Sequence, residues 1–351
     1  MTMTAVISAT SVVCAAGFGA DQVWATTRSR VSRISNSSVM DRHLEPIPMG
    51  LVPETALDAD GPEPNPLGWP SRVRRMLRLA APALRELAEE AGDVPVALYL
   101  GLPQPLSNDE PSWRDDFSTQ LCARAGLKLD DAASRTFAAG RAAFLIALES
   151  ALEALGADPA RPILVGAVDT FLDLSLLATL SAEGRVLGPQ VMDGFIPGEG
   201  AAFLLLGAAD QPAPGALVIR GAASSLDPGH RYGTEPARGE GLAQALEVLR
   251  ERASAPLTPI GSTFAGFNGE NFDAKLWGVA QLRHKDFFDP AMTLEHPASC
   301  FGDTGAATGA ILTVLAATAL AAQHRQGPAL VWAASDHAER GCAIVANTAP
   351  A

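Results

Sequence analysis

The chain has 351 residues and a formal net charge of -13, with a sequence pI near 4.9. Nucleic acids and anionic membrane surfaces bind basic protein faces, so this charge excludes both as expected partners. Hydrophobic residues make up 48% of the sequence, enough for a large core, and the length exceeds that of one typical domain. We therefore expect either one large α/β unit or two fused halves.

The cysteines and the N-terminal residues indicate a cytoplasmic protein. The four cysteines lie far apart and form no CxxC pair, so neither a disulfide framework nor a metal site is predicted; they are Cys14, Cys122, Cys300 and Cys342. Polar residues interrupt the apolar run of residues 1–13, and no basic region precedes it, which indicates a strand and not a signal peptide. Since no window reaches the roughly 18 apolar residues of a membrane span, we expect no membrane association. We also expect no cofactor.

Strands and helices alternate over the first part of the chain. Strands are predicted at residues 5–13, 94–101, 163–169 and 203–206, and helices at 20–27, 72–92, 113–125 and 141–155. Periodicity disappears over residues 36–70, and seven prolines occur between Pro46 and Pro70. We expect a long irregular insertion over the surface there, with a lid as the alternative.

The helix at 72–92 has an unusual order of charges. Basic residues stand at its start and acidic residues at its end: Arg72, Arg74, Arg75 and Arg78, then Glu86, Glu89 and Glu90. This order opposes the helix dipole by a few tenths to about 1 kcal/mol per charge. Two interpretations remain open, a solvated helix face and pairing with carboxylates nearby or on a partner.

An elbow precedes the helix at 141–155. The segment from Arg135 to Gly140 turns through small residues directly into this apolar helix. Such a turn presents one side chain at the positive end of a helix, where a thiolate would be stabilised. We expect Phe137 to occupy that position.

A glycine-rich block, DGFIPGEGAA, covers residues 193–202. Its glycines are expected to place backbone against backbone where side chains would not fit. Glu199 should be buried and paired, because an unpaired buried carboxylate is costly. The residues of this predicted structural motif are Asp193, Gly194, Gly198, Glu199 and Gly200.

The order of elements begins again after the linker AADQPAPG at 208–215. Strands are predicted at 216–223, 259–264, 328–333 and 342–347, and helices at 240–253, 271–282 and 304–323. The two parts, 1–215 and 216–351, therefore look like one topology used twice, each with βα alternation around a largely parallel sheet.

These residues carry a family resemblance. Residues 138–202, with the LVGAVDT strand and the DGFIPGEGAA block, resemble the β-ketoacyl-acyl-carrier-protein synthases of the thiolase fold. FGDTGAATG at 301–309, with Gly302 and Gly305, resembles the GHTGAAAG motif of that family. The resemblance implies two βαβαβαββ halves in a layered α-β-α-β-α arrangement. It also implies a twofold dimer in which the strand leading into the elbow, at 132–136, pairs with its copy.

The same resemblance implies where catalytic residues would stand. The cysteine nucleophile falls on Phe137, the two histidines on Asn268 and Asp303, and the lysine on Ala298. The glycine-rich FGFGG segment is replaced by SDHAER at 335–340. A thioester condensation needs a nucleophile and oxyanion donors, so these substitutions together imply loss of this chemistry. For Asp303 we expect a structural role as the N-cap of the helix that follows.

Three functions remain open at this point. The first is an inactive accessory or scaffold protein, because residues 267–283 and 296–309 resemble synthase-like proteins of type VI secretion loci. The second is a chain-length-factor-like partner of an active ketosynthase that works with an acyl-carrier protein. The third is an atypical acyltransferase that uses Cys300 with His296; burial of Cys300 as a small apolar residue is the competing interpretation.

Overall fold

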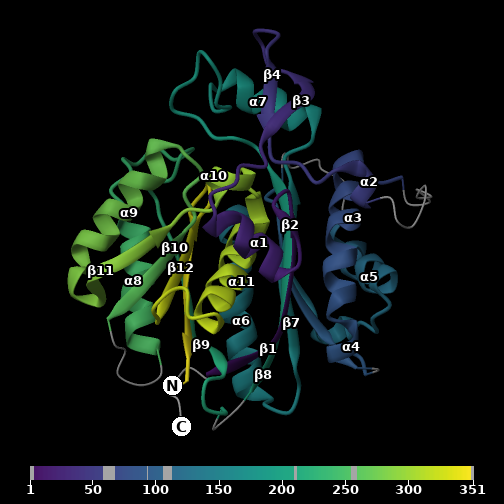
Figure 1. Cartoon of the computed structure of the whole chain (residues 1–351), viewed down its shortest axis with the longest axis vertical. Coiled ribbons are helices and arrows are strands. Elements are labelled where there is room, and N and C mark those ends of the chain that lie inside the picture. Colours follow the sequence, from purple (N-terminus) through teal and green to yellow (C-terminus); the bar gives the residue numbers. More distant parts are fainter. Residues whose placement is uncertain are drawn as a thin grey trace.

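The computed structural model describes residues 4–57, 68–92, 94–105, 113–208, 212–253 and 259–348. Among these residues, ten strands follow one another across a mixed sheet in the order β11-β10-β12-β13-β9-β1-β8-β7-β5-β6. The sheet falls into two five-stranded parts of identical order, which meet where β1 pairs with β9 (Figure 1).

The first part contains β1 (Ala5–Cys14), β5 (Ala97–Leu102), β6 (Arg135–Ala138), β7 (Ile163–Thr170) and β8 (Glu199–Ala208). Strand β5 runs parallel to β6 and β7, whereas β8 runs antiparallel to both β7 and β1. Helices α3 (Ser71–Glu86) and α5 (Arg114–Ala125) cover the outer face of this part.

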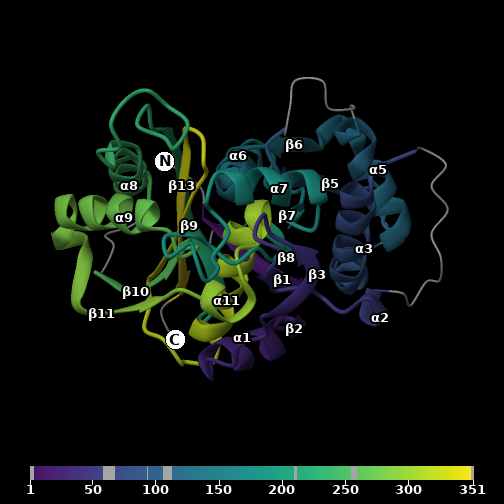
Figure 2. The ribbon, with the colours of Figure 1, turned by 90° about the horizontal axis from the view of Figure 1, so that it is seen from above.

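The second part repeats this arrangement with β9 (Leu217–Leu226), β10 (Ile260–Ala265), β11 (Phe288–Glu295), β12 (Ala329–Ala334) and β13 (Glu339–Asn347). Helices α8 (Glu240–Arg252) and α9 (Asn271–Arg283) cover its outer face (Figure 2). The prediction of one topology used twice is confirmed. In each part four strands run in the same direction, as the prediction of a largely parallel sheet requires, and one strand, β8 or β13, runs antiparallel between two of them.

Two helices fill the space between the two parts of the sheet. They are α6 (Ala143–Ala157) and α11 (Thr308–Ala321), which pack against strands of both halves. Strands β1 and β9 pair at Ala5–Ile219 and Val6–Val218, close to one end of both strands, so the sheets diverge beyond that point. The layers are therefore α-β-α-β-α, as the resemblance implied.

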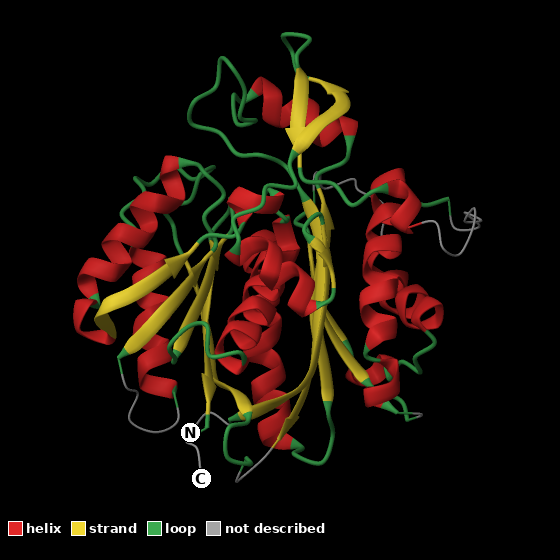
Figure 3. Cartoon of the chain, viewed as in Figure 1, coloured by secondary structure: helices red, strands yellow, loops and turns green. Residues whose placement is uncertain are grey.

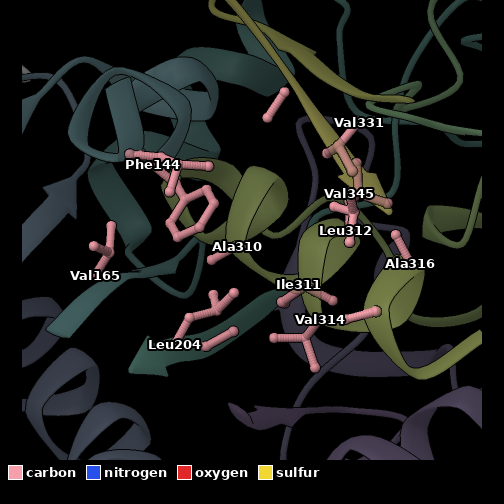
Figure 4. Close-up of a cluster of buried hydrophobic side chains, with 14 of the residues drawn as sticks. Phe144, Val165, Leu204, Ala310, Ile311, Leu312, Val314, Ala316, Val331 and Val345 are labelled. Atoms are coloured by element: carbon pink, nitrogen blue, oxygen red, sulfur yellow. The ribbon is translucent and has the colours of Figure 1, made fainter. Parts of the chain in front are cut away.

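Helix α11 is apolar around its whole circumference, as expected for a helix in the centre of a large core. Ile311, Leu312 and Val314 meet side chains from strands on either side, including Val345 of β13 (Figure 4). Its small residues bring the two central helices close together; a side chain at Gly309 would meet Leu145 of α6 at 3.2 Å.

A small cap lies over one end of the sheet. It consists of the hairpin β3 (Ser35–Met40) and β4 (Pro46–Met49) beside α7 (Leu174–Ala182), above the rest of the chain in Figure 3. Phe171, Leu177 and Phe195 belong to its own apolar core. The prediction of an irregular excursion over residues 36–70 is thus wrong for the hairpin and for α2 (Glu54–Leu57). Residues 58–67 of that segment lie outside the described residues.

Several shorter elements complete the description: β2 (Gly17–Phe18), α1 (Ala20–Arg28), α4 (Ala88–Ala91) and α10 (Ala298–Phe301). The predicted helix at 72–92 is divided at Leu87, between α3 and α4. Of the predicted linker at 208–215, residues 209–211 lie outside the described residues. Within the described ranges, none of the helices combines the length and apolar character needed to cross a bilayer.

Candidate functional site

The elbow differs in detail from the sequence-based expectation. Phe137 lies inside β6, opposite Gly101 of β5, and its ring packs beside Tyr99 with 6.1 Å between the centroids. The turn itself is made by Gly140, whose φ of 60° is left-handed and favours glycine. A 3-10 turn, η2 (Gly140–Ala142), then leads into α6. The prediction that Phe137 occupies the turn is therefore wrong, although the residues that do occupy it, Ala139 and Gly140, also carry no nucleophile.

The segment at 335–340 closes against this elbow. The Ser335 hydroxyl donates to the carbonyl of Ala139 and accepts a hydrogen bond from the Ala142 amide at 3.0 Å. Arg340 is buried, and its Nη1 donates to the carbonyls of Ser335 and His337. The loop between β12 and β13 is thereby fixed directly beside Arg141.

The two predicted histidine positions lie together. Asn268 Nδ2 donates to Asp303 Oδ2 at 3.3 Å and to Glu270 Oε2 at 2.8 Å. Asp303 is buried, and its main partner is Arg141, whose Nε donates to Oδ2 at 2.7 Å. Asp303 Oδ1 also accepts the Gly305 amide at 2.8 Å, at the start of the 3-10 turn η4 (Gly305–Ala307) that leads into α11. The expected bond to the start of the helical segment is thus present, although the cap position is Thr304, and Asp303 is also the counter-ion of a buried arginine.

Arg141 and Asp303 belong to a larger cluster of charges, which we call the ionic floor: Arg141, Arg185, Arg231, Glu270, Asp303 and Asp336. Asp336 Oδ2 accepts from Arg141 Nη1 at 3.0 Å, and Oδ1 accepts from Arg185 Nη2 at 2.8 Å. Glu270 completes the set by pairing with Arg185 through both oxygens, at 3.0 and 2.9 Å. Each guanidinium therefore faces carboxylates from the second half of the chain.

Electrostatic attraction holds Arg141 and Asp336 in their charged forms. Burial opposes the charge of Arg141, but the attraction of Asp303 and Asp336 outweighs it and raises the pKa of this arginine. Burial likewise disfavours the charged form of Asp336, yet Arg141 and Arg185 hold its pKa well below the ordinary value. Asp303, at the position that the resemblance assigns to the second histidine, is already engaged by Arg141.

A cavity of about 340 Å³ lies above the ionic floor. Gly140, Arg141, Arg185 and Asp336 form its polar side, and Phe171, Leu176 and Leu180 of the cap form an apolar side. Asn268 and Asp303 line a separate space of about 10 Å³, together with Ala298 at the predicted lysine position. The Arg141–Asp303 pair lies between these two spaces, whereas Phe137 lines neither.

A second buried network joins α3 to the glycine-rich block. Glu199 is fully buried and receives hydrogen bonds from Arg75 Nε and Nη2, both at 2.6 Å, while Arg72 pairs with Asp169 at 2.9 Å. The prediction that Glu199 is buried and paired is confirmed. For Arg72 and Arg75, pairing with nearby carboxylates is the correct alternative, and the solvated face is wrong.

The other residues of the predicted motif are structural. A side chain at Gly198 would meet the carbonyl oxygen of Phe301 at 2.6 Å, so the block lies directly against the 301–309 loop. The Asp193 carboxylate accepts the amide of Asn271 at the start of α9. Gly194, Gly200, Gly302 and Gly305 all have backbone or side-chain atoms where a Cβ would stand.

Cys300 lies outside both spaces. It is buried, and its sulfur contacts Ser299 Oγ at 3.9 Å and the Thr27 carbonyl at 4.0 Å. Burial raises the pKa of this thiol, which disfavours the thiolate. Within the described residues, no group of His, Cys, Asp and Glu has the arrangement of a metal site.

Comparison with known proteins supports the fold. No protein-family model matches the sequence, and no curated protein is detectably similar to it. Solved structures, in contrast, match over nearly the whole chain. A ketosynthase (ApeO) in complex with its chain length factor (ApeC) from Xenorhabdus doucetiae has a TM-score of 0.78 at 17% identity, over 99% of this chain and 98% of that one.

Two further structures are similar. The ishigamide ketosynthase/chain length factor has a TM-score of 0.72 at 18% identity, covering 98% of this chain and 99% of that one. A ketosynthase from module 6 of the bacillaene synthase of Bacillus subtilis 168 has a TM-score of 0.77 at 14% identity, covering 99% and 72%. The chain therefore has the thiolase-like fold of ketosynthases.

Asp303→Ala should lower the free energy of unfolding by about 3–5 kcal/mol, because the buried Arg141 guanidinium loses its main counter-ion. Asp303→Asn should also be strongly destabilising, since the amide carries no charge. Denaturant unfolding measures both. Asp173→Ala is the matched control, because Asp173 caps α7 through the Leu176 amide and should cost about 1 kcal/mol. A loss for Asp303→Ala no larger than that of the control would contradict the ion-pair role.

The buried carboxyl of Asp273 provides a pH-dependent test. Burial raises its pKa to about 7, with Asp336, Glu270 and Asp303 adding to the rise and Arg141 opposing it. A raised folded-state pKa means that this group costs stability increasingly as pH rises from about 4 to about 7. The stability of Asp273→Asn relative to the parent should thus grow by on the order of 2–3 kcal/mol between pH 5 and pH 8.

Urea unfolding at several pH values measures this difference. Asp286→Asn, at an exposed position on η3 (Lys285–Phe287), is the reference for the same chemical change. A stability difference between Asp273→Asn and the parent that stays constant from pH 5 to pH 8 would contradict the prediction.

Proposed function

We propose that this protein is a catalytically inactive ketosynthase-like protein that acts as an accessory or scaffold through protein–protein contacts in the cytoplasm. The observation that carries the proposal is the buried Arg141–Asp303 ion pair. In the family that the sequence resembles, the residue at the position of Asp303 stabilises developing negative charge. A carboxylate there has the wrong charge for this task, and Arg141 already engages it.

The surroundings of this pair support the same conclusion. Ala139 and Gly140 at the elbow provide no nucleophile, and Asn268 is held between Asp303 and Glu270. Buried Cys300 contacts neither the elbow nor the cavity, so the observations do not favour an acyltransferase that uses its thiol. The residues that remain are well suited to hold the loops in place and poorly suited to thioester chemistry.

Two candidate partners are each favoured by a different observation. The resemblance of residues 267–283 and 296–309 to synthase-like proteins of type VI secretion loci favours a secretion component. The second candidate function, a chain-length-factor-like partner of a ketosynthase, is favoured by the likeness over nearly the whole chain to structures that contain such pairs. We prefer the first, and the two differ in the proteins that should be recovered with this chain.

Self-association is also part of the proposal. Strand β6 lies at the end of the strand order, and its residues Arg135, Thr136 and Ala138 are exposed. An unpaired edge strand is available for pairing with another chain. The predicted pairing segment at 132–136 needs correction, because residues 131–133 form the 3-10 turn η1 (Asp131–Ala133) and the strand begins at Arg135. We propose that β6 pairs with its copy across a twofold axis.

The purified protein should not become acylated and should not condense acyl and malonyl thioesters. Intact-mass spectrometry after incubation with an acyl thioester tests this, with an active ketosynthase treated in the same way as the positive control. Since each cysteine is buried, no stoichiometric adduct is expected on any of the four. An adduct at one cysteine that disappears on its replacement by alanine would overturn the inactive assignment.

Affinity purification from the native cell, in a strain with one tagged and one untagged copy, tests the partners. We expect recovery of the untagged copy and of type VI secretion components, without a ketosynthase. Recovery of a ketosynthase and an acyl-carrier protein in place of the untagged copy would replace the accessory role with the chain-length-factor role. Absence of the untagged copy from every preparation would contradict the proposed pairing of β6 with its copy.

A further inference from the structure

We propose that the ionic floor is a carboxylate-binding site whose resident ligand is the side chain of Asp336. Three guanidinium groups converge on this one carboxylate: Arg141 at 3.0 Å, Arg185 at 2.8 and 3.1 Å, and Arg231 at 3.3 Å. They come from the turn after β6, the segment after α7 and the loop after β9. The planar guanidinium matches the geometry of a carboxylate, so this convergence forms a specific anion site.

Asp336 differs from the other acids of the floor in its position. The side chains of Asp303 and Glu270 are 1% and 3% exposed and contact the arginines from the protein interior. The side chain of Asp336 is 23% exposed and lines the 340 Å³ cavity. It therefore stands where an incoming ligand would first meet Arg141 and Arg185.

Asp336 is the counter-ion that the three arginines share. Arg141, Arg185 and Arg231 also face Asp303 and Glu270, and Glu183 lies 3.9 Å from Arg185, so removal of Asp336 takes one negative charge from beside the cavity. One arginine atom of the floor has donor capacity that is not used. Arg231 Nε is buried and lies 3.3 Å from Asp336 Oδ1, but it has no partner in hydrogen-bond geometry.

The cavity walls define the class of ligand. Phe171, Leu176 and Leu180 form an apolar wall, with the Phe171 ring centroid 5.8 Å from the Arg141 guanidinium carbon, and Gln104 and Tyr232 add polar atoms to the lining. A small carboxylate with a short apolar body matches both walls, since its charged end replaces Asp336 and its carbons cover the cap residues. Displacement involves the side chain alone, because the Asp336 carbonyl is fixed by the Arg231 amide at 3.0 Å.

The test is rescue of Asp336→Ala by free carboxylates. The variant should have a lower melting temperature than the parent, and acetate should restore it in a saturable manner, whereas chloride at the same ionic strength should not. Butyrate should saturate at a lower concentration than acetate because of the apolar wall. Isothermal titration of the folded variant with butyrate should show one site per chain, with the parent binding more weakly.

Two further variants keep the test decisive. Glu183→Ala removes another acid from the same cavity, at 3.9 Å from Arg185, and should respond to acetate as the parent does. Asp336→Ser also leaves space for the carboxylate and remains measurable if the alanine variant does not fold. Equal responses of the Asp336 variants to acetate and chloride would overturn the proposal, and so would equal rescue of Glu183→Ala. Neither result bears on the partners recovered from cells, so the two proposals fail separately.

Discussion

The ion pair between Arg141 and Asp303 is the interaction on which the arrangement of the site depends. It joins the turn after β6 in the first half of the chain to the loop before α11 in the second half, at a position buried from solvent. Removing an arginine from water is costly unless counter-ions with good geometry replace its hydration. Asp303 supplies the first counter-ion and Asp336 the second. Arg185 and Glu270 then extend the alternation of charge toward the cavity. The result is a continuous connection between the two halves, near the ends of the parallel strands β6, β10 and β12.

The same physical rule explains the arginines at the start of α3. Their position opposes the helix dipole, but this cost is small beside that of an unpaired buried carboxylate. Glu199 and Asp169 are both buried, and Arg75 and Arg72 neutralise them. The unfavourable order of charges in α3 is therefore the consequence of a tertiary requirement. Glu199 in turn accepts the Val52 amide and so holds the segment that leads out of the cap hairpin. The two networks together attach the cap and the loops of both halves to the rigid sheet.

The fold could be predicted from the sequence because its strands and helices are long, apolar and repeated in the same order in both halves. The errors fall where local signals are weak. Strand β11 was missed because most of its residues are exposed and it contains Pro290, so it has no apolar periodicity. The position of the turn was displaced by three residues, from Phe137 to Gly140, because the sequence does not specify where β6 stops pairing with β5.

The members of the ionic floor were mostly missed for a different reason. Arg141, Arg185 and Asp336 are separated by tens of residues, and a pattern of spacing cannot show that the three meet. One signal was present, a charged residue directly before the apolar first turns of the helix at the elbow. An arginine there must be paired if it is buried, which would have directed attention to acids in the second half.

The proposed absence of ketosynthase chemistry and the retention of the fold are linked by this network. The ends of the parallel strands in the two halves bring loops together around a space that is shielded from water, whatever residues those loops carry. The polar groups in that space need partners, because each unsatisfied buried group costs about 1–3 kcal/mol. Here paired charges fill the space, and they fix the loops at 266–270 and 335–340 more firmly than apolar residues would, because each bond is directional. A surface held by such bonds keeps one shape without a bound substrate, which is the property that the proposed accessory role requires.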